Sequence, residues 1–363
     1  MGDAAVNVLR VRQVAAVLLL VLMATLGGLW LFSPIEPVAW LPPPKSPLEG
    51  AYAPNTRLQP IEWWNKALIG PEAITVEPDG TLLAGLKDGR IVRLRVGSDE
   101  VQVVADTRGR PLALERHPDG RLIICDAKGG LLALDEEGSL ETLATSHANI
   151  PFKFVDDLAI TRAGVIYFSD ASARNSIDEF TLDLLEHRTT GRVVKYVPET
   201  KVLTEVANGF SFANGVALSG DESFLVIAET GSYRLWRVWL SGEKAGKKEL
   251  FTDSLPGFPD NVRWSPTRNG FWVAIGSPRK PLIDTLASWP NVRRIAGALP
   301  KTLQPKAARH SYVLLVDVNG KAVESFQDEG AETYSPVAGV TEADGYLYLG
   351  SFAREGLARF KLP

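Results

Sequence analysis

The sequence predicts an all-β protein, a six-bladed β-propeller with an N-terminal transmembrane helix. Three observations lead to this prediction: a strand–turn–strand pattern occurs six times after residue 72, an uncharged apolar run lies near the N-terminus, and a hydrophobic content of 45% is combined with 32 Gly and 24 Pro. A chain rich in both apolar and turn residues favours β structure. The expected organisation is a cytoplasmic N-terminus over 1–13, a transmembrane anchor over 14–32, a Pro-rich linker over 33–50 and the propeller over 51–363.

The expected anchor is the unbroken uncharged run from Val14 to Phe32. A helix of this length crosses roughly 30 Å of hydrocarbon. Arg10 and Arg12 precede the run, so the positive-inside rule keeps the N-terminus in the cytoplasm and places the propeller on the extracytoplasmic side, in a periplasm, a lumen or the cell exterior. A cleavable signal peptide is the alternative, although its apolar core is usually shorter and is followed by small residues.

Each repeat consists of an apolar strand, a tight turn and a second strand. In the first copy, residues 72–76 are followed by a turn at Asp79-Gly80 and a strand that begins at Thr81. Apolar alternation between such turns is a hairpin signal. The copies start near 72, 111, 156, 214, 260 and 337, and the first four spacings of 39, 45, 58 and 46 residues suit the roughly 40 to 50 residues of a four-stranded blade. A β-sandwich is the structural alternative.

Two segments depart from this regular pattern. Residues 33–50 contain six prolines and suit an extended, semi-rigid spacer. Residues 279–309 lie in the longest gap between repeats and combine helical spacing, at Leu282, Leu286 and Trp289, with a series of basic residues. We expect this insertion to cap the mouth of the propeller or to rest on anionic lipid beside the anchor, and a solvated basic loop is the alternative.

Charge and cysteine content exclude several classes of function. The chain has 39 Lys and Arg against 43 Asp and Glu, a net charge of -4, so nothing draws it to nucleic acid and we expect no nucleic-acid partner. Cys125 is the only cysteine, which rules out an intramolecular disulfide and leaves a Cys/His zinc or redox site unsupported. The oligomeric state is not predicted.

Polar residues recur where each innermost strand begins, and in a propeller these positions face the central axis. The strand starts supply Glu72, Asp156 or Asp157, Asn214, and Asp260 or Asn261. Carboxylate and amide oxygens are the ligands that Ca²⁺ accepts, with loose geometry. The pattern therefore predicts a divalent cation at the axis. The alternative is that these side chains cap strand ends or stabilise turns.

Several longer motifs resemble strictosidine-synthase-like proteins, and they occur in the same order along the chain. They lie at residues 110–112, 167–170, 191–194, 209–219, 228–230, 233–237, 255–261 and 347–351. The resemblance covers nearly everything after the spacer. It is closest to the membrane-anchored branch similar to adipocyte plasma membrane-associated protein, and more distant to the senescence-marker/gluconolactonase, diisopropylfluorophosphatase and paraoxonase propellers.

The resemblance implies a six-bladed propeller with an axial calcium held by Glu, Asn, Asn and Asp in chain order. In this sequence those positions are Glu72, Asp156, Asn214 and Asp260. Asp156 departs from the pattern, because the family usually has Asn-Asp where this chain has Asp156-Asp157. We expect the extra carboxylate to bind the cation more tightly and to leave it a weaker Lewis acid.

Two further departures restrict the reaction that the resemblance implies. Strictosidine synthases use a catalytic Glu near the last blade, and residues 335–340 offer none, so alkaloid condensation is not expected. Paraoxonases use a paired-histidine relay, whereas the four histidines here lie far apart in the sequence and are expected to be surface or structural residues: His117, His147, His187 and His310. The sequence has no Gly-X-Ser-X-Gly elbow either, which disfavours a serine esterase.

The remaining mechanism is metal-assisted hydrolysis by a calcium-dependent lactonase or arylesterase. Asp260 is the first choice for the carboxylate that activates water or attacks directly, with Asp157 and Glu229 as the next candidates. The expected substrate pocket consists of Arg110, Phe210, Phe212, Tyr233 and Tyr334, although aromatic residues at strand ends are more often core. A non-catalytic binding module with structural calcium is the competing function, and fold alone does not decide between them.

Overall fold

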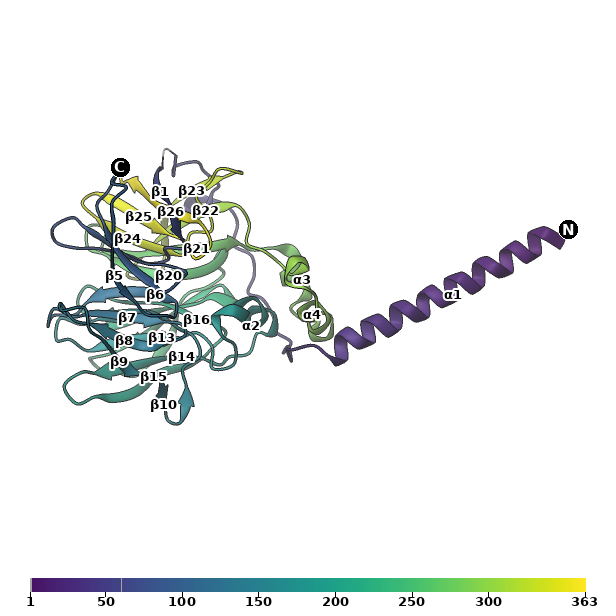
Figure 1. The fold of residues 1–363 in the computed structure, drawn as a ribbon, viewed down its shortest axis with the longest axis horizontal. Helices are drawn as coiled ribbons and strands as arrows, with labels where there is room; N and C mark the ends of the chain where they lie inside the picture. Colours follow the sequence, from purple (N-terminus) through teal and green to yellow (C-terminus); the bar gives the residue numbers. More distant parts are fainter. Residues whose placement is uncertain (1, 60) are drawn as a thin grey trace.

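The computed structural model describes residues 2–59 and 61–363, so Met1 of the expected cytoplasmic segment and Pro60 of the expected propeller range lie outside the described residues. Six four-stranded antiparallel sheets form the main domain (Figure 1). The predicted six-bladed propeller is therefore confirmed, and a β-sandwich is excluded. Inner strands begin close to all six predicted repeat starts.

The first three blades follow one another along the chain, and each runs from its innermost to its outermost strand. Blade one consists of β2 (Ile74–Val76), β3 (Leu82–Gly85), β4 (Arg90–Leu94) and β5 (Val101–Asp106). Blade two consists of β6 (Pro111–Arg116), β7 (Leu122–Asp126), β8 (Gly130–Leu134) and β9 (Leu140–Ala144). Blade three consists of β12 (Val155–Ile160), β13 (Ile166–Asp170), β14 (Gly191–Val197) and β15 (Val202–Phe210). A small hairpin, β10 (Ser146–His147) with β11 (Ile150–Pro151), lies between blades two and three.

The last three blades include the closure of the ring. Blade four consists of β16 (Ala213–Leu218), β17 (Phe224–Glu229), β18 (Arg234–Trp239) and β19 (Lys248–Thr252). Blade five consists of β20 (Gly257–Ser265), β21 (Gly270–Pro278), β22 (His310–Asp317) and β23 (Ala322–Glu329). Blade six combines β24 (Gly339–Ala343), β25 (Tyr346–Gly350) and β26 (Glu355–Lys361) with the N-terminal β1 (Glu62–Ile69). Pairing of β1 with β26 joins the two ends of the domain and removes an open sheet edge.

The predicted turns form the inner hairpins of the blades. Gly80 and Gly120 have positive φ angles of 78° and 97°, where glycine carries no steric penalty. The Asp79 side chain accepts a hydrogen bond from the Thr81 backbone N–H at 3.0 Å and fixes the turn between β2 and β3. Short-range sequence therefore determines these hairpins.

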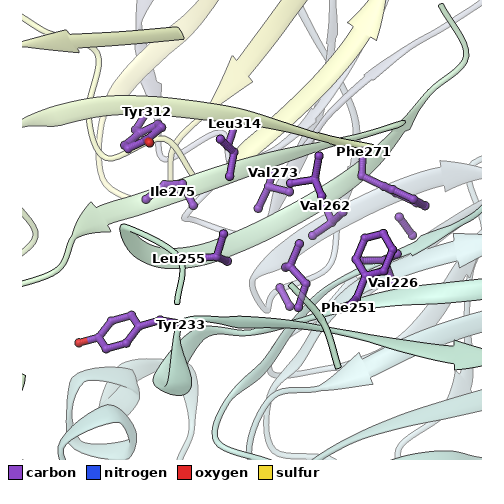
Figure 2. Packing of buried hydrophobic residues seen from close by; sticks show 14 of the residues in the cluster. Val226, Tyr233, Phe251, Leu255, Val262, Phe271, Val273, Ile275, Tyr312 and Leu314 are labelled. Atoms are coloured by element: carbon purple, nitrogen blue, oxygen red, sulfur yellow. The ribbon is translucent and has the colours of Figure 1, made fainter. Parts of the chain in front are cut away.

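The hydrophobic core is divided into clusters between neighbouring blades, because both faces of each sheet are covered. The cluster between blades four and five joins Val226 of β17, Val262 of β20 and Phe271 of β21, all fully buried (Figure 2). Phe251 and Phe271 pack edge to face with ring centroids 5.8 Å apart. Each blade is thus stabilised by its neighbours, as the repeat pattern implies.

Short helices lie in the connections of two blades. The segment between β13 and β14, called the roof here (residues 171–190), contains η2 (Ile177–Glu179) and α2 (Phe180–Glu186). The predicted helical insertion, called the cap here (residues 279–309), contains α3 (Pro281–Leu286), α4 (Pro290–Gly297) and η4 (Lys301–Leu303). Single 3-10 turns occur at η1 (Gly50–Tyr52) and η3 (Thr230–Ser232).

The N-terminal helix α1 (Gly2–Leu31) projects away from the propeller on the side of α2, α3 and α4 (Figure 1). Its segment Arg12–Leu31 is long and apolar enough to cross a membrane, and a signal sequence has the same properties. Among the described residues this is the single helix of that kind.

The linker after α1 is extended, as expected, but it is packed onto the domain rather than free. Ile35 is fully buried. The indole of Trp40 stacks on the imidazole of His187, with ring centroids 3.8 Å apart and planes at 9°. Arg279 of the cap donates to the backbone carbonyl of Pro43 at 2.8 Å. The linker therefore connects the end of α1 to both the roof and the cap.

Candidate metal centre

Three of the four predicted ligands lie at β-bulges of inner strands. In β12 the pairing register shifts between Val155 and Leu158, which encloses Asp156. A register shift of the same kind encloses Asn214 in β16, and another encloses Asp260 in β20. A bulge adds one residue to a strand and re-aims its side chains, so it turns these oxygens towards the axis without breaking the blade.

Glu72 reaches the same region from the loop before β2. Its backbone carbonyl packs so closely on the last blade that a Cβ at Gly339 would lie 2.1 Å from the carbonyl oxygen, and one at Gly350 would lie 1.7 Å away. Glycine is therefore required at both positions. The four predicted ligands come from blades one, three, four and five, and the propeller axis is the place where inner strands of all these blades meet.

The four side chains are buried and only partly hydrogen-bonded. Glu72, Asp156, Asn214 and Asp260 are at most 7% exposed. Oδ1 of Asp156 and Oδ1 of Asn214 have no hydrogen-bond partner, and neither does the amide of Asn261. An unpaired buried oxygen costs about 1–3 kcal/mol, so several in one place suit an electrophilic ligand such as a metal ion.

The carboxylates also interact electrostatically with one another. Burial raises the pKa of Glu72 to about 7, with Arg110 opposing the shift and Asp157 adding to it. Burial, followed by the charges of Glu72 and Asp260, raises the pKa of Asp156 well above its ordinary value. Burial and the charge of Glu72 do the same to the pKa of Asp260. The site thus concentrates negative charge that a divalent cation would neutralise.

Arg110 is the cation nearest to the predicted ligands. It is 4% exposed, and one guanidinium nitrogen lies 3.2 Å from Oε2 of Glu72 while the other donates to the Gly70 carbonyl at 2.8 Å. We expected Arg110 in the substrate pocket, and the structure places it as a partner of Glu72. It fixes the orientation of that carboxylate.

Both carboxylate oxygens of Asp157, the second candidate for catalysis, are paired with other protein groups. Both of its oxygens accept hydrogen bonds from Arg263, at 2.6 and 2.7 Å, and Oδ2 also accepts the Val216 backbone N–H at 2.9 Å. The Arg263 guanidinium also lines a cavity of about 500 Å³ formed by the far ends of the inner strands. The Asp157–Arg263 pair therefore lies in the channel below the predicted ligands and carries no free carboxylate oxygen.

The donor set fits a hard cation such as Ca²⁺. Among the described residues, no three His, Cys, Asp or Glu side chains already stand in metal-ligating geometry. One of the four predicted ligands is an amide, and Glu72 is paired with Arg110. The unpartnered oxygens of Asp156 and Asn214, together with the carboxylate of Asp260, nevertheless give the all-oxygen environment that Ca²⁺ prefers.

The roof covers this end of the axis. Phe180 packs edge to face on Phe352 of blade six, with centroids 5.6 Å apart. Nζ of Lys128 in blade two lies 3.0 Å from the Asp178 carboxylate, and Lys301 of the cap donates to the Asp178 carbonyl at 3.0 Å. A segment of blade three that touches blades two, five and six has to cross the axis.

The aromatic residues expected in a pocket have different positions. Phe212 belongs to a cluster with Phe154 beneath the roof, at a centroid distance of 5.2 Å. Phe210 is fully buried in the core between blades three and four. Tyr334 is fully buried near blade six and donates to the Gly356 carbonyl at 2.8 Å. Tyr233 lies under the Arg279 guanidinium, 4.4 Å from its ring centroid.

Glu229, the remaining catalytic candidate, is held inside blade four. Its oxygens accept hydrogen bonds from the Ser211 backbone N–H at 2.8 Å, the Ser232 hydroxyl at 3.0 Å and the Trp236 indole at 2.7 Å. This pattern gives Glu229 a bracing role between strands. The structure brings Phe212 alone of the predicted pocket aromatics under the roof, and it adds Phe154 and Phe180, which the sequence analysis did not single out.

Three of the four histidines have structural contacts. His117 is 7% exposed and its Nε2 lies 2.9 Å from the Gly164 carbonyl oxygen. His187 lies 3.1 Å from the Ser211 hydroxyl and stacks on Trp40. His310 lies 3.1 Å from the Gln327 side-chain oxygen. These contacts belong to separate blades and form no relay.

Comparisons with known proteins agree with this architecture. The family model for strictosidine synthase matches residues 156–243, and the model for the strictosidine synthase-like N-terminal region matches residues 50–94. Adipocyte plasma membrane-associated protein of Rattus norvegicus is 34% identical over 93% of this chain and 96% of its own length. Protein STRICTOSIDINE SYNTHASE-LIKE 10 of Arabidopsis thaliana is 35% identical over 78% of this chain and 82% of its own length.

Solved structures with the same fold have much lower identity. A gluconolactonase from Xanthomonas campestris superposes with a TM-score of 0.60 at 19% identity, covering 91% of this chain and 98% of its own. The calcium-binding protein regucalcin from Agrobacterium tumefaciens superposes with a TM-score of 0.55 at 18% identity, covering 80% and 89%. At these identities the likeness establishes the fold.

Proposed function

The chain belongs to the strictosidine synthase-like family that includes adipocyte plasma membrane-associated protein, and from this membership we propose that it is a membrane-anchored, calcium-dependent hydrolase of lactones or aryl esters. Its fold is also that of a gluconolactonase and of a calcium-binding regucalcin. The substrate is a small ester or lactone, with no role for nucleic acid.

The observation that carries the proposal is the group of buried oxygens on four blades. Glu72, Asp156, Asn214 and Asp260 converge at one end of the axis, three of them through β-bulges. Structural burial alone does not account for unpartnered oxygens, because a folded chain normally pairs them. A site built for Ca²⁺ does account for them.

Each residue has a defined task in this mechanism. Bound Ca²⁺ would supply electrophilic polarisation of the carbonyl under attack. The residues that would hold the cation through side-chain oxygens are Glu72, Asp156, Asn214 and Asp260, and Arg110 orients Glu72. Asp260 is the carboxylate that accepts the proton of the attacking water or attacks the carbonyl itself.

The apolar residues beneath the roof keep bulk water from the reacting group. Phe154, Phe180 and Phe212 lie in or against one cluster there. Exclusion of water strengthens every electrostatic interaction in such a site, since the local dielectric falls. The same residues favour an aromatic or aliphatic group on the substrate.

The N-terminal helix is proposed as a permanent anchor, with the N-terminus cytoplasmic and the propeller on the extracytoplasmic side. Trp30 Nε1 donates to Asn291 of α4 at 3.1 Å, and the Ser33 hydroxyl donates to the Arg294 carbonyl at 2.6 Å. These contacts join the end of α1 to the cap. A cleaved signal peptide would lose them, so they favour a helix that is retained. Arg10 and Arg12 support the orientation.

A non-catalytic binding module is the second candidate function. Two observations favour it: the four ligands are at most 7% exposed beneath the roof, and the Arg110 cation competes for Glu72. In that function Ca²⁺ stabilises the blades without contacting a substrate.

The deciding experiment measures hydrolysis of phenyl acetate and a lactone panel by the full chain in detergent, with Ca²⁺ and with a chelator. We expect turnover that the chelator abolishes and that Asp260→Asn lowers by at least about 100-fold. Glu229→Gln is the control, because this buried carboxyl group lies within a blade. Absence of turnover, with Ca²⁺ still raising the melting temperature, would instead support the binding module.

A further inference from the structure

The end of the N-terminal helix is fastened to the cap. Besides the contacts of Trp30 and Ser33, Nε of Arg294 donates to the Trp30 carbonyl at 3.0 Å, and its guanidinium lies 4.3 Å from the Trp30 ring centroid. A Cβ at Gly297 of α4 would lie 2.4 Å from Cδ1 of Ile35, so the linker passes directly against this helix. The cap therefore lies where α1 ends.

The roof side of the linker is fixed in the same way. The Val38 backbone N–H donates to the Glu186 carbonyl at 3.0 Å, and Arg293 of α4 donates to the Leu185 carbonyl at 2.7 Å. Arg293 is 2% exposed although it carries a charge. The end of α1, the linker, the cap and the roof are thus joined, and the propeller cannot turn freely about the anchor.

The cap exposes large apolar side chains that a protein facing only water would bury. Leu282 and Leu303 are each 67% exposed, Trp289 is 60% exposed and Val292 is 39% exposed. Phe32, at the end of α1, is 82% exposed. Exposed tryptophan and leucine side chains in short helical segments next to a transmembrane helix are typical of the membrane interface.

The cap is also strongly basic in an acidic protein. Residues 279–309 contain seven Lys and Arg and one Asp, whereas the whole chain has a net charge of -4. The single acid, Asp284, is paired with Arg279 at 3.1 Å. Lys301, Lys306 and Arg309 are exposed. Each basic residue near an anionic bilayer contributes about 1 kcal/mol of attraction.

We propose that the cap is a second membrane contact, lying in the headgroup layer beside the anchor with Leu282, Trp289 and Leu303 inserted and the basic side chains on anionic lipid. The inference rests on the part of the proposed function that makes α1 an anchor. It goes beyond that function, because it also fixes the orientation of the propeller. The end of the axis that carries the predicted ligands and the roof faces the bilayer.

The test uses the full chain reconstituted into vesicles of neutral lipid, or of neutral lipid with anionic phosphatidylserine. Single cysteines replace Leu282, Trp289 or Leu303 and carry an environment-sensitive fluorophore, while quenchers are placed on the lipid at headgroup depth. The native Cys125 is fully buried and stays unlabelled. Val103→Cys and Val202→Cys are controls, because those valines are 50% and 51% exposed on strands away from the cap.

We expect at least about three-fold stronger quenching at the cap positions than at the controls, and more in anionic vesicles than in neutral ones. Replacing Lys280, Lys301 and Lys306 together by Gln should reduce cap quenching in anionic vesicles to the level seen in neutral ones. A chain that floats with the vesicles while its cap labels are quenched no more than Val103→Cys overturns the inference alone. A chain that does not float with the vesicles overturns the anchor.

Discussion

Asp156 and Asp157 are adjacent in β12, yet their side chains lie towards opposite ends of the propeller axis and have different partners. Asp157 lies in the channel, where Arg263 occupies both of its oxygens. Asp156 lies at the roofed end, where Oδ1 has no partner and where burial, followed by the charges of Glu72 and Asp260, raises its pKa. One carboxylate is neutralised by the chain itself, and the other is the one that the proposed function assigns to a cation from solution.

Under the proposed function, Asp157 carries a structural charge and Asp156 a metal-binding one. A buried ion pair with good geometry holds two blades in register and stays closed, as Asp157 of blade three does with Arg263 of blade five. A cluster of unpaired carboxylates destabilises the metal-free protein and persists where a ligand compensates for it. The predictions below test whether the two neighbours behave in these opposite ways.

The largest expected effect is at the Asp157–Arg263 ion pair. Arg263→Met should lower the free energy of unfolding by about 3–5 kcal/mol, because it leaves Asp157 buried without its partner. Chemical denaturation measures this loss. The double variant Asp157→Asn/Arg263→Met should recover part of it, whereas a loss below about 1 kcal/mol in the single variant would show that the pair is unimportant.

At the roofed end the corresponding change should have the opposite sign in metal-free protein. Ca²⁺ at 100 times its dissociation constant should stabilise the wild-type chain by about 2.7 kcal/mol. Asp156→Asn should stabilise the metal-free protein, since it removes an uncompensated charge, and should reduce the gain from Ca²⁺. Thermal melts with chelator and with Ca²⁺ measure both; a destabilised metal-free variant would contradict the distinction.

A third prediction concerns pH and the roof, which covers the Asp156 end of the axis. Burial raises the pKa of Asp183 in α2 to about 6, above its value of about 4 in an unfolded chain. Its stabilising contribution is therefore complete below about pH 4 and is lost as the pH rises through about 6, a change of about 2.7 kcal/mol.

Asp183→Asn should remove this part of the pH dependence. The variant keeps the Oδ1 that accepts hydrogen bonds from Ser172 at 2.5 Å and Asn175 at 2.8 Å. Melting temperatures of the two proteins between pH 4 and 7, in chelator, measure the difference. An unchanged slope would mean that Asp183 does not titrate in this range.

The smallest expected effect is on the linker. Trp40→Ala removes the stack on His187 and should cost about 1 kcal/mol of stability. Hydrogen exchange should then be faster in α2 and α4 than in the blades. Equal protection throughout would show that the linker does not hold the roof and the cap together.

The sequence predicted well those features that depend on neighbouring residues. The six hairpins follow from Asp-Gly and similar turns such as Asp79-Gly80. The apolar run predicted α1, and the helical spacing of residues 279–309 predicted helices in the cap. Each of these sequence patterns is contained within a single hairpin or helix.

Features that depend on distant residues were missed. The pairing of β1 with β26, the partners Arg110 and Arg263, and the bulges at the predicted ligands arise when strands far apart in the chain meet. Phe210 and Tyr334 were expected in a pocket and lie in the core, because an aromatic at a strand end has the same sequence pattern in either place. The packing of the linker was missed as well, because a proline-rich segment has the same sequence pattern whether it is free or packed on a domain.

Calorimetric titration of the full chain with Ca²⁺ tests the central claim most directly. The account predicts one binding site in the wild-type chain, an affinity at least about ten-fold weaker in Asp260→Asn, and unchanged affinity in Glu229→Gln, whose carboxyl group is equally buried but bonded within blade four. Absence of binding in the wild-type chain, or equal binding by all three proteins, would contradict a calcium site on the propeller axis.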